Sequence, residues 1–297
     1  MDAERRYLLL VNPSAGGGRV GELLPRAEAA MTAHGLSYRL VRTQSLVHGV
    51  EEARAAAADG EIPVVMSGDG LIGQVGGTLA GGEVPLAIMP GGRGNDLARV
   101  VGIPTEPEAA AALIARGTTQ TIDVGEANGW RFLCIASCGF DSDANRIANE
   151  TRWLKGNLVY LYAALRALAA WKPARFTLTL DGERREVTGY SVAAANSKAY
   201  GGGMFIAPGA RLDDGLLDIV WTEHVGKLRF LSQLPKVFKG EHTENPEVHE
   251  KRAAEVTIEA DRPFAVYADG DHLTDLPATV RLLPGALRLI APETRPA

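Results

Sequence analysis

Three glycine-rich segments are the parts of this chain best suited to hold phosphate groups. They read NPSAGGGR, SGDGLIG and PGGRGND, and each follows a short apolar run. Glycine lets backbone N–H groups approach an anion closely, and a helix beginning after the loop adds a favourable dipole. Three such loops after three strands predict a phosphate-rich ligand. None has the Walker pattern, and none has GxGxxG with a later acid on a strand, which excludes an ordinary P-loop protein and a standard dinucleotide dehydrogenase.

Carboxylates lie in and beside these loops. Asp69 is in SGDG, Asp96 is in GND and Asp123 is in DVG. An aspartate next to a phosphate is unfavourable unless a cation separates the charges, and Mg²⁺ prefers a few carboxylates together with phosphate oxygens. The alternative is purely structural, because Asp69 and Asp96 could be turn residues or helix N-caps.

Two more acidic motifs, ARLDDGLLD and YADGD, follow in the second half. Asp269 comes directly after the strand-like run FAVYA, which would hold its carboxylate at a strand end. Such a carboxylate could accept the proton of an attacking hydroxyl in phosphoryl transfer. Asp-Gly is also the commonest hairpin signal, and DDG could be only a turn capped by Asp213 or Asp214.

The elements that must position these residues differ between the two halves. Up to about Thr121, apolar run, glycine loop and helix alternate at the spacing of βαβ units, which predicts an α/β domain with a mostly parallel sheet. After Asp123, short segments that alternate apolar and polar residues predict antiparallel strands. Two helices interrupt them. One covers about 225–238, and the other has a leucine stripe expected to face the core, formed by Leu154, Leu158, Leu161, Leu165 and Leu168.

Composition limits the class of protein. The chain has 297 residues, 46% hydrophobic and 23% charged, which is typical of a soluble globular protein with two domains. A net charge of -5 argues against a nucleic-acid partner. Cys134 and Cys138 share one apolar run without further ligands at zinc spacing, so both are expected to be buried. No apolar run reaches the ~18–20 residues of a membrane span, which predicts a cytoplasmic protein.

The order of the motifs carries a family resemblance. NPSAGGGR, SGDGL, PGGRGNDLAR, ARLDDGLLD, FKGEH and YADGD appear in sequence between Tyr7 and about Leu289. Together they resemble the diacylglycerol kinase catalytic family, which includes bacterial lipid kinases and sphingosine and ceramide kinases. The resemblance implies an α/β nucleotide-binding domain similar to NAD kinase and phosphofructokinase over 1–122. It also implies a C-terminal antiparallel β-sandwich with helical insertions over 123–285, with 286–297 returning to the first domain.

The resemblance also implies roles for individual residues. The nucleotide-binding positions are Asn12, Pro13, Ser14, Thr43, Ser67, Gly68, Asp69, Gly70, Leu71, Gly92, Arg93, Gly94 and Asn95. The catalytic positions are Asp269 as general base, Asp69, Asp96 and Asp123 as organisers of Mg²⁺, and Asp271, where the family usually has Glu. A structural Mg²⁺, held in the family by two backbone carbonyls and one carboxylate, maps to Arg211, Asp214 and Leu216.

The expected activity is transfer of the γ-phosphate from ATP with Mg²⁺ to a hydroxyl of a diacylglycerol- or sphingoid-like lipid. Two alternatives stay open: a kinase of the same fold acting on a soluble metabolite, and a non-catalytic nucleotide-binding regulator. The second is motivated by Gly73 and Gln74, where the family usually has Asn and Glu, and by Arg93, where it has Thr or Ser. Arg93 could grip the triphosphate or block the nucleotide site.

Peripheral membrane contact and a homodimer are left open as further partners. The helix at about 225–240 is the better candidate for a membrane surface, because Lys and Arg accompany apolar residues along it. These residues are Lys227, Leu228, Arg229, Phe230, Leu231, Leu234, Lys236, Phe238 and Lys239. A solvated basic face is the simpler alternative.

Overall fold

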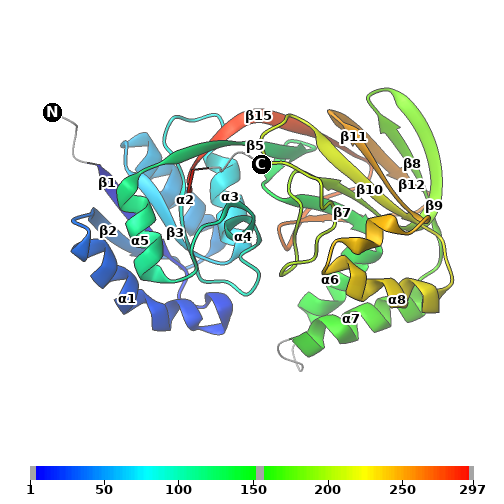
Figure 1. The fold of residues 1–297 in the computed structure, drawn as a ribbon, viewed down its shortest axis with the longest axis horizontal. Helices are drawn as coiled ribbons and strands as arrows, with labels where there is room; N and C mark the ends of the chain where they lie inside the picture. Colours follow the sequence, from blue (N-terminus) through cyan, green and yellow to red (C-terminus); the bar gives the residue numbers. More distant parts are fainter. Residues whose placement is uncertain (1–4, 152–156, 294–297) are drawn as a thin grey trace. The chain divides into compact units, whose positions relative to one another are not determined.

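A computed structural model describes residues 5–151 and 157–293 of the chain. The chain divides into two compact units (Figure 1). Unit 1 is Met1–Val124, Leu212–Asp214 and Leu283–Ala297, and unit 2 is Gly125–Arg211 and Gly215–Leu282. The long strands β5 (Thr119–Ala127) and β15 (Ala278–Ile290) each begin in one unit and end in the other.

Unit 1 is built on a parallel sheet in the order β2-β1-β3-β4. Its first strand is buried from Tyr7 to Val11, as the continuous apolar run predicts for a strand covered on both faces. The helices α1 and α5 pack together, as do α2 and α3. Because crossovers between parallel strands are right-handed, α1 and α2 lie on opposite faces of the sheet. The bounds are β1 Arg6–Val11, η1 Ala15–Gly17, α1 Arg19–Ala33, β2 Ser37–Arg42, α2 Leu46–Ala58, β3 Ile62–Ser67, α3 Asp69–Leu79, β4 Ala87–Pro90, α4 Asp96–Val101 and α5 Pro107–Arg116.

Helix α3 forms despite the glycines within it. Gly73, Gly76 and Gly77 are all buried, although each costs about 1 kcal/mol relative to Ala in a helix interior. The helix packs closely against its neighbour α2, where a Cβ on Gly49 would lie 2.8 Å from Cδ1 of Leu71. Tertiary packing therefore outweighs the poor helix propensity of this segment.

The last residues of β15 belong to unit 1. The N–H of Leu86 donates to the carbonyl of Arg288, and the N–H of Ile290 donates to the carbonyl of Leu86. The final strand thus runs parallel to the segment that leads into β4.

Unit 2 is an antiparallel β domain with three helices among its described elements. The strand order through it is β14-β13-β7-β9-β8-β12-β15-β5-β6, with β10 paired to β9 and β11 paired to β10. The bounds are β6 Trp130–Phe132, β7 Ile135–Gly139, α6 Phe140–Glu150, α7 Asn157–Ala170, β8 Ala174–Leu180, β9 Glu183–Ala195, β10 Leu217–Glu223, α8 Lys227–Val237, η2 Glu241–Glu244, β11 Val248–Ala253, β12 Glu255–Ala260, β13 Ala265–Ala268 and β14 Asp271–Asp275. The predicted fold class, a parallel α/β domain followed by an antiparallel β domain, is confirmed.

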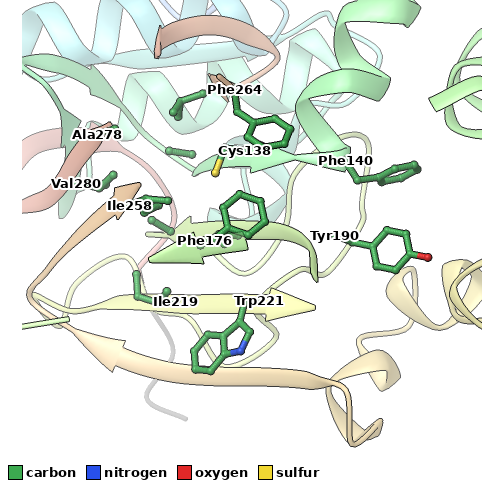
Figure 2. Close-up of a cluster of buried hydrophobic side chains, with 14 of the residues drawn as sticks. Cys138, Phe140, Phe176, Tyr190, Ile219, Trp221, Ile258, Phe264, Ala278 and Val280 are labelled. Carbon is green, nitrogen blue, oxygen red and sulfur yellow. The ribbon is translucent and has the colours of Figure 1, made fainter. Parts of the chain in front are cut away.

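The core of unit 2 combines aromatic and aliphatic side chains, as Figure 2 shows. Phe230 of α8 stacks on Tyr190 of β9, with ring centroids 4.0 Å apart, and meets Phe140 of α6 edge to face at 4.9 Å. These contacts fix both helices on the strands. Cys134 and Cys138 are both buried free thiols, as expected, and burial raises the pKa of Cys138 to about 12.

One helix differs from its prediction. Leu168 is buried, but Leu165 is 46% exposed, so the predicted leucine stripe is wrong at Leu165. The small side chains of Ala163 and Ala167 face the core instead, because they let α7 approach it closely. Leu154 lies outside the described residues, and the side chains of Leu158 and Leu161 are not described. Among the described residues, no helix has both the length and the apolar character needed to cross a membrane.

Candidate active site

The three glycine loops follow three adjacent parallel strands, at the edge of the sheet where ligands bind in open α/β folds. Asn12 follows β1, and its N–H donates to the carbonyl of Met66 at 3.2 Å. The N–H of Gly91, after β4, donates to the carbonyl of Ser67, the last residue of β3, at 2.9 Å. Backbone hydrogen bonds therefore hold the beginnings of the loops side by side.

Two contacts explain why these loops need glycine. A Cβ on Gly92 would lie 2.5 Å from the Cα of Gly68, and a Cβ on Gly16 would lie 2.3 Å from the carbonyl oxygen of Gly91. Neither position can carry a side chain without moving backbone. The loops pack backbone against backbone, which leaves N–H groups close to any anion bound there.

Asp69 links the second loop to the third. It lies in the first turn of α3, and its carboxylate accepts the N–H of Asn95 at 2.8 Å and of Asp96 at 2.7 Å. These two residues are the N-cap and first residue of α4, so Asp69 caps that helix from a different loop. The side chain of Asn95, which has a left-handed backbone with φ 53°, in turn binds the backbone of Gly92.

A second carboxylate stands next to Asp69. A Cβ on Gly94 would lie 2.7 Å from Oδ2 of Asp69 and 2.9 Å from Oδ2 of Asp96, so both oxygens converge on one point. Burial, and then the negative charge of Asp96, raise the pKa of Asp69, although its two N–H donors act in the opposite direction. A cation between the two carboxylates would relieve this repulsion.

The residues present fit Mg²⁺ as an ion shared with phosphate groups. Mg²⁺ is commonly bound by one or two carboxylates plus substrate phosphates, and Asp69 and Asp96 supply two. No cluster of three or more His, Cys, Asp or Glu side chains suited to a metal occurs in the described part of the chain. A complete protein cage for the ion is therefore not found there.

Other predicted nucleotide-binding residues surround these loops. The N–H of Thr43 donates to the carbonyl of Val11 at 2.8 Å, directly after β2. Thr43 and Leu71 both lie against Gly49, because a Cβ there would be 3.1 Å from Cγ2 of Thr43. The remaining positions are in the same loops: Pro13 and Ser14 follow Asn12, Gly68 is the N-cap of α3, and Gly70 is in its first turn.

Arg93 is exposed in the third loop, yet it reaches the first one. Its Nη2 lies 3.6 Å from the position of a Cβ on Gly17. A guanidinium at this place can form two parallel hydrogen bonds to a phosphate. In this position Arg93 would either hold the phosphates or block the nucleotide site, and both alternatives stay predictions.

Asp123 lies on a strand of unit 1 and not in one of the glycine loops. It lies on β5 and is only 3% exposed. Its N–H donates to the carbonyl of Leu212 at 2.6 Å, and its Oδ1 accepts the N–H of Gly285 at 2.7 Å. Asp123 thus joins three segments of unit 1 that are distant in sequence.

Asp269 is held firmly within unit 2. It and Gly270 form the two-residue turn between β13 and β14, with φ of 52° and 96°, as the Asp-Gly hairpin signal predicts. A hairpin turn does not require the hydrogen bonds that the Asp269 carboxylate forms. Its Oδ2 accepts the N–H of Leu133 at 2.7 Å, and its Oδ1 accepts the N–H of Cys134 at 2.9 Å.

The neighbours of Asp269 on β14 are exposed. Desolvation raises the pKa of the Asp271 carboxyl, although much of the residue faces solvent. His272 packs edge to face on Tyr267 and contacts Asp275 at 3.0 Å through Nε2. His272 is therefore an exposed residue of β14 that contacts its own neighbours.

Two features of unit 2 escaped the sequence interpretation. The backbone donors at Leu133 and Cys134 have no signature in residue type, because any non-proline residue supplies an N–H. Asp141, in the first turn of α6, is a second shielded carboxyl, and burial raises its pKa to about 6. The sequence pattern that could have identified Asp141 is its place directly after the apolar strand in IASCGFD.

The predicted structural Mg²⁺ residues Arg211, Asp214 and Leu216 lie in and beside a short segment assigned to unit 1. All three make contacts within the protein. A site made of two carbonyls and one carboxylate would not form a cluster of acidic side chains, so this site stays a prediction.

Comparison with known proteins defines the class. Residues 6–127 match the diacylglycerol kinase catalytic domain, and residues 134–291 match the YegS C-terminal NAD kinase beta sandwich-like domain. The chain is therefore a two-domain kinase.

Its relatives agree over nearly the full length. A diacylglycerol kinase of Mycobacterium tuberculosis is 39% identical, over 96% of this chain and 94% of that protein. A probable lipid kinase YegS-like of Pseudomonas aeruginosa is 33% identical, over 100% and 97%. The crystal structure of a diacylglycerol kinase from Bacillus anthracis is 26% identical with a TM-score of 0.77, over 99% of this chain and 98% of that one. This chain belongs to the diacylglycerol kinase family of lipid kinases.

Proposed function

We propose that this kinase transfers the γ-phosphoryl group of ATP, as its Mg²⁺ complex, to a hydroxyl of a diacylglycerol- or sphingoid-like lipid. The observation that carries the proposal is the convergence of Asp69 and Asp96 beside three glycine loops. An anion-binding backbone next to two repelling carboxylates suits a phosphate ligand that arrives with a cation.

The nucleotide is assigned to a domain comprising 1–122 together with 286–297. Backbone N–H groups of the loops at Asn12–Ser14, Ser67–Leu71 and Gly92–Asn95 would bind the phosphates. Arg93 would add a bidentate contact, and Thr43 would contact the nucleotide from the end of β2. Bound Mg²⁺ would neutralise charge on the phosphates, and Asp69, Asp96 and Asp123 are assigned to hold it and its waters.

The acceptor is assigned to the β domain over 123–285. Asp269 would accept the proton of the acceptor hydroxyl as that oxygen forms its bond to phosphorus and the bond to ADP breaks. An ionised carboxylate has about four acceptor sites, and the N–H groups of Leu133 and Cys134 use two of them. These donors hold the carboxylate in one orientation, which a general base needs. Asp271 would contribute negative charge nearby.

Two further assignments complete the proposal. Arg211, Asp214 and Leu216 would hold a structural Mg²⁺, which would stabilise the segment around them. The enzyme would work in the cytoplasm, with peripheral contact to the membrane where its lipid acceptor lies. A kinase of the same fold acting on a soluble metabolite is the competing function.

The test is transfer of label from γ-labelled ATP in the presence of Mg²⁺, with a total lipid extract and an aqueous metabolite fraction offered separately. The proposal expects a labelled, organic-soluble product that disappears without Mg²⁺ and with the Asp269→Asn variant. Label confined to the aqueous fraction would replace the lipid acceptor by a metabolite.

A further inference from the structure

A buried side-chain amide lies directly behind the segment that holds Asp269. Asn196 follows the last residue of β9, Ala195, and both residues are 0% exposed. Burying an amide costs free energy unless it forms hydrogen bonds, so a buried asparagine is expected to make specific contacts. The contacts of Asn196 therefore show what this position requires.

The partners of Asn196 are two residues that leave the sheet. Leu133 and Cys134 form a bend between β6 and β7 and belong to neither strand. The side-chain Nδ2 of Asn196 donates to the carbonyl of Leu133 at 2.8 Å. The N–H groups of Asn196 and Ser197 both donate to the carbonyl of Cys134, at 2.9 and 3.1 Å. The bend is thus fixed to the end of β9 through both of its carbonyl groups.

The N–H groups of the same bend bind the carboxylate of Asp269. The N–H of Leu133 donates to Oδ2 at 2.7 Å, and the N–H of Cys134 donates to Oδ1 at 2.9 Å. The bend is buried, and without strand partners its polar groups need other partners inside the protein. Asn196 and Asp269 supply them from two sides, one at the carbonyls and the other at the N–H groups.

One peptide group connects the two side chains. The carbonyl of Leu133 and the N–H of Cys134 belong to the same planar peptide unit. A donor at this carbonyl polarises the unit and makes its N–H a stronger donor, by ~10–30% per bond in condensed-phase estimates. The contacts therefore run from Nδ2 of Asn196 through this peptide to Oδ1 of Asp269.

We propose that Asn196 is a positioning residue for Asp269, because it fixes the bend whose N–H groups set the direction of the carboxylate. Asn196 is fully buried and acts through backbone groups. The inference rests on the proposed function, in which Asp269 is the general base. A base must lie within hydrogen-bond reach of the proton that it accepts, so a small displacement of its carboxylate slows the reaction.

The first measurement follows the peptide group itself by NMR. Leucine precedes Cys134, whereas serine precedes Cys138, and the chain has only these two cysteines. Labelling leucine carbonyls with ¹³C and cysteine with ¹⁵N therefore gives a single backbone correlation, that of Leu133 with Cys134. In Asn196→Ala the amide proton of Cys134 should move upfield, because the peptide is less polarised. An unchanged signal in this variant would overturn the proposal.

The second measurement is the steady-state kinetics of the full chain with Mg²⁺-ATP and the total lipid extract. Asn196→Ala should lower kcat about three- to tenfold, which is less than the loss of the base itself, and leave KM for ATP within about twofold. Asn196→Asp has nearly the same shape, but its ionised carboxylate offers no donor to the carbonyl, so it should lose at least as much. It keeps the test usable where the alanine variant does not fold.

A double variant tests whether Asn196 acts through Asp269. Adding Asn196→Ala to Asp269→Asn should leave the residual kcat unchanged, because both substitutions remove the same contribution. If the two losses multiplied in the double variant, Asn196 would act independently of Asp269 and the proposal would be wrong.

The matched control is Asn128→Ala in the same unit. Nδ2 of Asn128 donates to the carbonyl of Pro277 at 3.1 Å, and its Oδ1 accepts the N–H of Thr279 at 3.1 Å. This variant should lower the melting temperature, as Asn196→Ala does, but leave kcat and the Cys134 signal unchanged. An equal loss of kcat in both variants would show that Asn196 only stabilises unit 2.

Failure of the proposed function would look different. Wild-type turnover of Asp269→Asn would reject the base itself, and the positioning role with it, even where the Cys134 signal moves as expected. If Asp269→Asn is inactive and Asn196→Ala has the wild-type kcat, the base assignment is retained and the positioning role alone is rejected.

Discussion

Asp69 in unit 1 and Asp269 in unit 2 are held in the same way but have different neighbours. Each follows a buried strand, and each carboxylate accepts two backbone N–H groups from a distant segment. Asp69 shares its site with Asp96, which helps to raise its pKa, whereas Asp269 lies in a left-handed turn and accepts the N–H groups of Leu133 and Cys134. Two carboxylates that repel each other suit a cation, and one carboxylate oriented by donors suits proton transfer. This difference supports the proposed division of roles, with metal and phosphate binding at Asp69 and base catalysis at Asp269.

The largest loss of activity among the variants of unit 1 is expected at Asp69. Asp69→Asn removes a metal-binding carboxylate and turns an amide group toward the N–H groups of Asn95 and Asp96. We expect kcat/KM to fall about a hundred- to a thousandfold. Kinetics over a range of Mg²⁺ concentrations would measure the loss. Asp59→Asn is the matched control, because Asp59 is an exposed acid directly after α2, and it should leave kcat/KM unchanged.

A smaller effect is expected at Gly94. An alanine Cβ would lie within 3 Å of both carboxylates, at 2.7 and 2.9 Å, and would push Asp69 and Asp96 apart. Gly94→Ala should raise the Mg²⁺ concentration needed for half-maximal activity at least about tenfold, since cation sites tolerate displacements of well under 1 Å. Gly226→Ala, where a Cβ meets open space, is the control. If Gly94→Ala showed the same Mg²⁺ dependence as the wild type, Mg²⁺ would not bind between Asp69 and Asp96.

Asp141 of unit 2 is a carboxylate in a different environment from Asp269. Unlike Asp269, it has no side-chain hydrogen bond among the described residues, and burial raises its pKa from 3.8 to about 6. The folded protein therefore holds this proton more tightly than the unfolded chain, and folding stability falls as pH rises from about 4 through about 6.

Asp141→Asn should remove this dependence. Above pH 7 the variant should exceed the wild type by ~1–3 kcal/mol in free energy of unfolding, and below pH 4 the two should coincide. Urea denaturation at both pH values measures the difference. A constant difference between them would show that Asp141 does not titrate in this range.

The smallest effect is expected at Arg93. Arg93→Ala should raise KM for ATP about three- to tenfold and change kcat little, because an exposed guanidinium contributes ground-state phosphate binding. A lower KM in the variant would instead mean that Arg93 obstructs the nucleotide.

The sequence predicts much of this molecule because the glycine loops and buried strands have strong local signals. The strand before Asn12, the parallel sheet and the helix with Lys227 all follow from residue patterns. What it could not predict depends on tertiary contacts. Helix α3 forms through buried glycines, and Leu165 points outward because alanines of α7 face the core. The donors to Asp69 and Asp269 are backbone N–H groups, which no residue type reveals.

The division of roles between Asp69 and Asp269 is tested most directly with Asp269→Asn. Both kcat and the dissociation constant of Mg²⁺-ATP should be determined for it. We expect kcat to fall at least about a hundredfold, as for loss of a general base, while nucleotide affinity changes by less than about twofold. A near-UV circular dichroism spectrum equal to that of the wild type would show that the variant is folded, because the aromatic core lies in unit 2 with Asp269. A variant with nearly wild-type turnover, or one whose only defect is nucleotide affinity, would contradict the division of roles between Asp69 and Asp269.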